Sequence, residues 1–345
     1  MGVNLTPIII KQILALNDLG GRSLAVDANN YLYQFLSLIR TRDGTPLKDS
    51  EGNVTSHLAG LMSRSTRLIH DFNIDLIFVF DGQPPHLKEK EIEKRRESRE
   101  KALHEWRQAL EAHDYVKAFS KAVMTSRLTQ SMIEDAKKLL TLLGIPYVQA
   151  PSEAEAQTAY MAMQGDVWAA SSKDYDCILF GAPKLLRFLT IYGQEYLPRK
   201  GTTRSLKPEL IVLEQLLSHL GLTRLQLVDL AILVGTDFNE GIKGIGPKTA
   251  LKLVKEYKRI ENLPSKFESK IPPEYEKVRH IYLHPQTTLE YDLSYGPLRE
   301  DELFHFSCSQ GNFSPKRVEI AIQRMKKVYL RKQQLKLEKW LTKCD

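Results

Sequence analysis

The sequence contains few cysteines. Cys177, Cys308 and Cys344 stand alone among 345 residues, and none is spaced as in a CxxC motif. This pattern argues against disulfide bonds, structural zinc and iron–sulfur clusters. The sequence also lacks an apolar run long enough to span a bilayer and a charged start followed by an apolar core. We therefore expect no membrane segment and no signal peptide, and a protein that stays inside the cell.

Internal repeats and long low-complexity tracts are also missing, while acidic residues follow apolar segments in a regular way. Four segments that we predict to be strands are each followed by one or two carboxylates, and a further carboxylate precedes a glycine-rich turn. The seven acids are Asp27, Asp81, Glu153, Glu155, Asp174, Asp176 and Asp237.

These seven carboxylates predict a metal site. The carboxyl ends of parallel strands lie at one edge of a sheet, so acids placed there can converge. Seven carboxylates cannot all ionise in one cleft unless cations neutralise them. Ligands that are all oxygen favour Mg²⁺ or Mn²⁺ over zinc. The net charge of +7 leaves the remaining surface basic, which suggests a nucleic-acid phosphodiester as substrate.

The order of apolar segments predicts an α/β fold with a mostly parallel central sheet flanked by helices. Strands are expected at about 22–26, 75–80, near 147 and at about 186–192, and helices from Tyr31, over 56–72, from Lys207 and up to Tyr257. Between Asp81 and the strand near Tyr147 lie about 65 residues without a strand signal, which is longer than an ordinary crossover. We therefore predict an insertion there.

The insertion begins with a charged run, Lys88–Lys101, that holds seven basic and five acidic residues. A solvated helix supported by i,i+4 ion pairs is one interpretation. The other follows from position, because the run starts seven residues after Asp81. Lys88 and Arg95 lie seven apart on one helical face, where they could lean over the cleft and hold a phosphate.

A glycine-rich turn follows Asp237. Gly241, Gly244 and Gly246 permit tight backbone turns, and Pro247 suits the first turn of a helix. The amides at that helix start, with Lys248 beside them, could cradle a phosphate. A simple turn between helices is the alternative. Gly-Ile-Gly-Pro-Lys between two amphipathic helices fits a helix-hairpin-helix that grips a DNA backbone without reading sequence.

The chain resembles the structure-specific flap endonucleases of the XPG/Rad2 group, most closely the archaeal type, along almost its whole length. The motifs that carry the resemblance are Met1-Gly2-Val3, Val26-Asp27-Ala28, Thr55-Ser56-His57-Leu58, Phe80-Asp81-Gly82 with Pro84-Pro85, Pro151-Ser152-Glu153-Ala154-Glu155-Ala156, Ser172-Lys173-Asp174-Tyr175-Asp176, and Gly235-Thr236-Asp237 ahead of Gly-Ile-Gly-Pro-Lys. The resemblance implies a PIN-like 5′ nuclease fold with a helical arch and an H2TH-like helix-hairpin-helix.

The same resemblance implies roles for the residues. The seven acids would hold two Mg²⁺ ions, with Mn²⁺ as a substitute, and Lys88 and Arg95 would position the scissile phosphate. The DNA-binding set that it implies is Gly2, Tyr33, Arg40, Thr55, Gly244, Gly246 and Lys248. In that set Tyr33 stacks a base, although an ordinary core tyrosine is the alternative, and Gly2 places the N-terminus beside the active site. The turn at 241–246 would bind K⁺.

The C-terminal segment resembles the sliding-clamp-binding box of this family, and the end of a core-packed helix is the alternative. The residues that match are Gln334, Leu337, Trp340 and Leu341, with Leu341 where the pattern prefers an aromatic residue. We expect binding to the sliding clamp PCNA, weakened by that departure. The absence of a basic extension after the box favours an archaeal cytoplasm, whereas a eukaryotic protein would be nuclear.

The expected domain organisation follows the same comparison. It has an N-terminal nuclease region (1–105), a helical arch or cap (85–130), an internal nuclease region (131–257) with the helix-hairpin-helix at about 225–257, a C-terminal helical part (258–330) and a tail with the clamp box (331–345).

The expected activity is a Mg²⁺-dependent 5′ flap endonuclease with 5′-3′ exonuclease activity at nicks and gaps. It would be monomeric and act on branched double-stranded DNA in Okazaki fragment maturation and base excision repair. A relative specialised as exonuclease, bubble nuclease or Holliday-junction resolvase, a non-catalytic junction scaffold and a PIN-type ribonuclease are the alternatives. The complete acid set disfavours the scaffold, and the arch and helix-hairpin-helix disfavour the ribonuclease.

Overall fold

The computed structural model describes residues 2–41, 43–189, 193–197 and 202–341. A seven-stranded sheet lies at its centre, with the strand order β1-β9-β6-β5-β2-β3-β4. The strands are β1 (Gln12–Ile13), β2 (Ser23–Asp27), β3 (Asp75–Phe80), β4 (Tyr147–Gln149), β5 (Ala169–Ser171), β6 (Lys184–Arg187) and β9 (Glu209–Val212). A separate hairpin is formed by β7 (Gly193–Leu197) and β8 (Thr202–Leu206).

The sheet is mostly parallel, as the sequence predicts. Strands β4, β3, β2, β5 and β6 lie side by side in this order and run parallel to one another. Antiparallel strands complete one edge, where β9 pairs with β6 and β1 pairs with β9. Leu24, Ala25 and Val26 of β2 are fully buried on both faces, which is why this strand reads as a continuous apolar run.

Two details of the predicted elements are wrong. Residues 209–212, expected to be helical, form β9, and the helix starts only at Leu213. The strand expected at about 186–192 lies at Lys184–Arg187, and residues 190–192 are outside the described part of the chain. Pairing of β9 with β6 supplies its backbone hydrogen bonds and overrides the local helical pattern.

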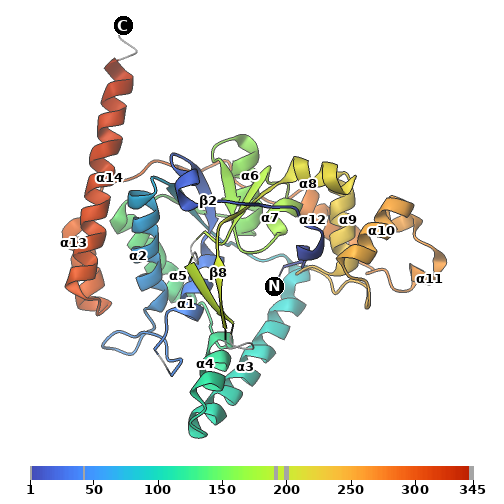
Figure 1. Cartoon of the computed structure of the whole chain (residues 1–345), viewed down its shortest axis with the longest axis horizontal. Coiled ribbons are helices and arrows are strands. Elements are labelled where there is room, and N and C mark those ends of the chain that lie inside the picture. Colours follow the sequence, from blue (N-terminus) through green and yellow to red (C-terminus); the bar gives the residue numbers. More distant parts are fainter. Residues whose placement is uncertain (1, 42, 190–192, 198–201, 342–345) are drawn as a thin grey trace.

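Helices cover both faces of the sheet (Figure 1). They are α1 (Ala28–Leu38), α2 (Ser56–Asp71), α3 (Glu89–Glu111), α4 (Tyr115–Met124), α5 (Gln130–Leu143), α6 (Ala154–Gln164), α7 (Asp176–Leu179), α8 (Leu213–Leu220), α9 (Arg224–Val234), α10 (Pro247–Tyr257), α11 (Ser265–Glu268), α12 (Tyr275–Leu283), α13 (Glu300–Phe304) and α14 (Pro315–Leu341). One core joins the sheet to α1, α2, α5 and α14, and another joins it to α7, α8, α9 and α12.

Two features project from this body. Helices α3 and α4 pack against each other and extend away from the sheet, and α10 and α11 lie at the opposite end of the molecule from α13 and α14 (Figure 1). The interface of the projecting pair uses small residues, because Ala102, Ala109, Ala118 and Ala122 are buried there. Elsewhere α3 is exposed and charged, so contacts at its base decide where the pair lies.

No single helix in the described ranges combines the length and apolarity needed to cross a membrane; α8 and α9 pass that test only as a pair bent by 77°. Leu227, Leu230 and Leu233 of α9 are fully buried in the core. Cys177 and Cys308 are free thiols, and Cys344 lies outside the described residues.

Candidate metal centre and DNA-binding surfaces

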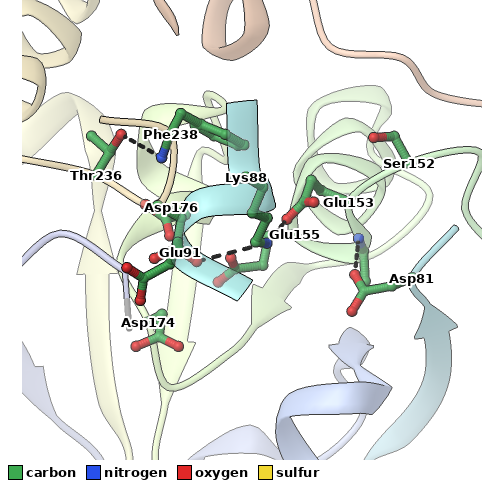
Figure 2. Close-up of polar contacts among 12 residues, drawn as sticks. Asp81, Lys88, Glu91, Ser152, Glu153, Glu155, Asp174, Asp176, Thr236 and Phe238 are labelled. Atoms are coloured by element: carbon green, nitrogen blue, oxygen red, sulfur yellow. Dashed lines mark hydrogen bonds and ion pairs between the residues drawn. The ribbon is translucent and has the colours of Figure 1, made fainter. Parts of the chain in front are cut away.

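The seven acids come from separate elements that end at one edge of the sheet. Asp27 is the last residue of β2, Asp81 follows β3, and Asp176 is the first residue of α7. Figure 2 shows Glu153, Glu155, Asp174 and Asp176 in one cleft, with Asp81 at its margin. The backbone N–H of Ala154, at the start of α6, donates to Asp81 Oδ1 at 2.7 Å. The topology therefore brings together carboxylates that are distant in sequence.

Burial and mutual repulsion perturb these carboxylates. Burial, followed by the charges of neighbouring acids, raises the pKa of Asp27 and of Glu155 well above ordinary values. The same causes, again led by burial, raise the pKa of Asp176 to about 7, and burial raises that of Glu153. The cleft thus has more negative charge than the chain compensates.

Lys88 and Arg95 offset part of that charge from the base of the projecting helices. Lys88 Nζ contacts Glu153 Oε2 and lies 3.7 Å from Asp237 Oδ2, between the acids (Figure 2). Arg95 donates to Asp237 Oδ2 at 2.6 Å. Although burial opposes the effect, Arg95 and Lys88 hold the pKa of Asp237 below its usual value. The sequence offered this position over the cleft as one of two interpretations, and the i,i+4 pair of the other is also present, between Arg95 and Glu91 at 3.0 Å.

The donor set fits a hard divalent cation. It consists of carboxylate oxygens, the ligands that Mg²⁺ and Mn²⁺ prefer. Within the described ranges, no three His, Cys, Asp or Glu side chains converge as the ligands of one ion would. Lys88 lies between Glu153 and Asp237. Its ammonium group therefore occupies the position from which a metal cation would neutralise these two carboxylates. Magnesium usually keeps several waters, so a loosely grouped acid set still suits it.

Neutral side chains orient the acids, and sequence reasoning missed them. Asn30 donates through its side chain to Asp174 Oδ2 and through its backbone to Asp27 Oδ1, both at 3.0 Å. Ser172 Oγ lies 3.2 Å from Asp27 Oδ2 and 2.9 Å from Glu155 Oε1 and can donate to either. Asn30 follows Asp27 by three residues, the spacing of a helix N-cap, which is the signal that could have revealed it.

Gly2 lies against the acid cluster, as expected. A side-chain carbon at this position would collide with the carboxylate of Asp176 and would approach Asp174 Cβ to 3.3 Å. The N-terminal segment therefore forms part of the cleft wall, and a side chain at position 2 would displace the Asp176 carboxylate.

The residues expected to contact DNA near the junction lie in contrasting environments. Tyr33 is 38% exposed, which excludes the alternative of a core tyrosine. Arg40 is held by three acceptors, Leu36 O, Gly44 O and Ser126 Oγ, and burial lowers its pKa to about 10. Thr55 is only 5% exposed. In this conformation Arg40 and Thr55 serve the protein's own packing.

The glycine-rich turn joins α9 to α10. Gly244 has φ 87°, in the region that favours glycine, whereas Gly246 has φ −96° and no atoms within 4 Å of an added Cβ. The backbone conformation therefore favours glycine at Gly244, whereas other residues could adopt that of Gly246. Pro247 is the first residue of α10, and Lys248 beside it is exposed.

The clamp-box segment lies at the end of α14, which extends past the body of the molecule (Figure 1). Gln334 is exposed. The structure describes α14 as a helix to Leu341 but does not describe the side chains of Leu337, Trp340 and Leu341, so binding of a clamp through this box stays a prediction.

Known proteins are similar to this chain in sequence and in fold. Residues 1–102 match the XPG N-terminal domain and residues 144–237 match the XPG I-region. Flap endonuclease 1 of Pyrococcus horikoshii is 46% identical over 344 residues, and that of Pyrococcus furiosus is 47% identical over 341; each alignment covers 99% of both chains. The structure titled flap endonuclease-1 from Methanococcus jannaschii is 38% identical, with a TM-score of 0.76, over 96% of this chain and 100% of that one. The catalytic core of Rad2 in complex with DNA substrate, at 24% identity, has a TM-score of 0.68 over 93% and 97% of the chains.

Proposed function

Because this chain belongs to the flap endonuclease family of XPG nucleases, we propose that it is a structure-specific 5′ flap endonuclease that hydrolyses a phosphodiester near the junction of single strand and duplex. One observation supports this most strongly: Glu153, Glu155, Asp174 and Asp176 lie in one cleft (Figure 2), where Lys88 contacts Glu153 and Arg95 pairs with Asp237. The enzyme is a nuclease, and its family depends on divalent metal.

The acids of the cleft would hold two Mg²⁺ ions, or Mn²⁺, directly or through water. When bound, these cations supply an activated water and stabilise charge on the leaving oxygen. Asn30 and Ser172 orient the carboxylates before any cation arrives. Lys88 and Arg95 would turn from the acids to the scissile phosphate, where their charges offset the charge of the transition state.

Substrate selection would be steric. We assign α3 and α4 to the arch predicted at 85–130, through which a free 5′ single strand passes, while exposed Tyr33 stacks a base near the cut. Gly2, Arg40 and Thr55 would adjoin the junction, the last two after release from their present contacts. The enzyme would also trim 5′ ends at nicks and gaps.

The duplex would be gripped at the turn between α9 and α10. Gly244, Gly246 and Lys248 are accessible there, at the start of α10, where backbone amides favour a phosphate. A K⁺ ion held by carbonyls of the turn would add to this contact. These contacts are independent of sequence, which suits an enzyme that recognises branched double-stranded DNA by shape.

In the cell, the activity would remove 5′ flaps during Okazaki fragment maturation and base excision repair. We propose a monomer with the five regions predicted from the sequence, recruited to PCNA through Gln334, Leu337, Trp340 and Leu341 in the terminal box.

The substitution Asp174→Ala tests the catalytic assignment. We expect it to abolish cleavage of a labelled 5′ flap substrate in Mg²⁺ while leaving junction binding nearly unchanged, because Asp174 serves the cations and not the duplex. Asp166→Ala is the matched control, since Asp166 is an exposed acid paired with Tyr291. Residual cleavage together with strongly weakened binding would contradict a metal-holding role.

A further inference from the structure

Asp176 accepts a hydrogen bond from a residue far from every motif. The hydroxyl of Tyr282, on α12, donates to Asp176 Oδ1 at 3.2 Å. Tyr282 is fully buried, 106 residues along the chain from its partner. On the other side of the carboxylate, Gly2 lies against Oδ2. The Asp176 side chain is thereby confined between the N-terminal segment and α12.

The ring of Tyr282 contacts elements that carry two of the acids. Its centroid lies 4.8 Å from that of Phe180, which follows α7, and 5.4 Å from that of Phe238, the residue after Asp237. Aromatic contacts at these distances stabilise a specific arrangement beyond simple burial. The Tyr282 side chain therefore fixes the position of the segment that carries Asp176 relative to the segment that carries Asp237.

Helix α12 is itself fixed to the helix that leads into the glycine-rich turn. Arg279 of α12 pairs with Asp229 of α9 at 2.7 Å, and the Asp229 carboxylate is completely buried. Arg224 of α9 donates to the carbonyl oxygen of Tyr282, also at 2.7 Å. Ion pairs and hydrogen bonds this well buried resist rearrangement, because breaking one leaves a buried polar group without a partner.

We propose that Tyr282 is a positioning residue of the metal centre, which fixes the orientation of Asp176 and ties the acid cluster to α9 and α12. This inference rests on the proposed metal-dependent nuclease function. Partners that orient a ligating carboxylate typically contribute 10–100-fold to metal affinity or activity. Tyr282 does not contact the reacting phosphate, so its effect passes through Asp176.

The substitution Tyr282→Phe tests the proposal, since it removes one oxygen and keeps the ring. Tyr295→Phe is the matched control, because the Tyr295 hydroxyl accepts from the Leu76 backbone N–H at 2.9 Å, away from the acids. Mg²⁺ binding to the DNA-free protein is measured by calorimetry, flap cleavage is titrated with Mg²⁺, and thermal unfolding checks folding.

We expect Tyr282→Phe to weaken Mg²⁺ binding about tenfold, and to regain the wild-type cleavage rate at high Mg²⁺. Tyr295→Phe should keep wild-type Mg²⁺ affinity even if its melting temperature falls. Equal Mg²⁺ affinity in both variants, or a rate loss in Tyr282→Phe that Mg²⁺ does not restore, would overturn the proposal. Absence of flap cleavage by the wild-type protein would instead count against the proposed function, which keeps the two failures apart.

Discussion

Lys88 contacts the carboxylates of the cleft, and in the proposed function it would contact the phosphate of a substrate instead. Its contacts with Glu153 and Asp237 raise its pKa above the ordinary value although burial opposes this, so the side chain stays charged. An ammonium among carboxylates also competes with any divalent cation for the same negative charge. The residue would therefore lower metal affinity in the DNA-free protein and assist the reaction once DNA is bound.

The substitution Lys88→Ala should separate these effects. Loss of a charge aimed at the transition state should lower the single-turnover cleavage rate by about 10²-fold, while Mg²⁺ should bind the DNA-free protein more tightly. Lys94→Ala is the control, because Lys94 lies in α3, the helix that Lys88 directly precedes, but pairs with Glu240 at the surface. If Lys88→Ala cleaves as well as Lys94→Ala, Lys88 does not act on the phosphate.

His57 predicts a pH dependence of stability. It is completely buried in α2, and burial lowers its pKa to about 4. Because the folded protein holds this proton less tightly than the unfolded chain, the contribution of His57 is complete above pH ~6.5 and is lost as pH falls towards 4. At pH ~4.5 this loss should be about 2 kcal/mol. Urea unfolding at pH ~7.5 and ~4.5 should show a smaller difference for His57→Gln than for the wild type; an equal difference would exclude His57 as its source.

The sequence predicts the charged residues of the site better than the neutral ones. Each acid follows an apolar strand or precedes a glycine turn, so local pattern and sheet topology together indicate a common cleft. Tyr282 is different, because its contact with Asp176 depends on how α12 packs against α7 and α9. Arg40 could be assigned to DNA from its position, but its present hydrogen bonds to Gly44 and Ser126 depend on tertiary structure.

Helices α3 and α4 depend for their position on contacts at their base and side. Besides the cleft contacts of Lys88 and Arg95, α4 packs against Gly44 in the loop at residues 43–54, and Trp106 of α3 donates to the Asp43 carbonyl oxygen at 3.4 Å. Gly44 brings this loop close, since an added Cβ would lie 2.7 Å from Ala122 Cβ. The loop and the projecting pair therefore should move together.

The substitutions Gly44→Ala and Gly52→Ala test this connection. Both glycines have similar positive φ values, 85° and 90°, so both substitutions introduce comparable backbone strain. An added Cβ at Gly52 meets nothing within 4 Å, whereas at Gly44 it collides with α4. We expect faster proteolysis within residues 89–124 only for Gly44→Ala. Equal proteolysis of the two variants would show that the loop does not hold the helices.

Elements with strong local patterns could be predicted, and elements decided by distant pairing could not. Strand β3 lies at the predicted residues, Asp75–Phe80, because its apolar run has clear polar boundaries. Strand β9 runs directly into α8 without a turn signal, so its four residues read as the start of the helix. Pairing with β6, more than twenty residues earlier, and with β1 near the N-terminus decides their conformation.

At the scale of the whole molecule, the chain combines opposite charges in separate places. Several carboxylates lie in one cleft (Figure 2), while the net charge of the chain is +7, so basic residues are in excess over the rest of the chain. A basic surface attracts the DNA backbone, and the acidic cleft rejects it until cations are bound. With the proposed function, this combination would allow the chain to bind DNA without metal and to cut it only with metal.

The proposed function requires that this molecule cut a 5′ flap at its junction by means of bound divalent cations. The most direct test is cleavage of a labelled double-flap DNA in Mg²⁺, compared with EDTA and with the same DNA carrying a bulky block on its 5′ end. We predict a single incision beside the junction that EDTA abolishes and the block reduces. DNA binding without incision, or unselective trimming of every end, would contradict the claim.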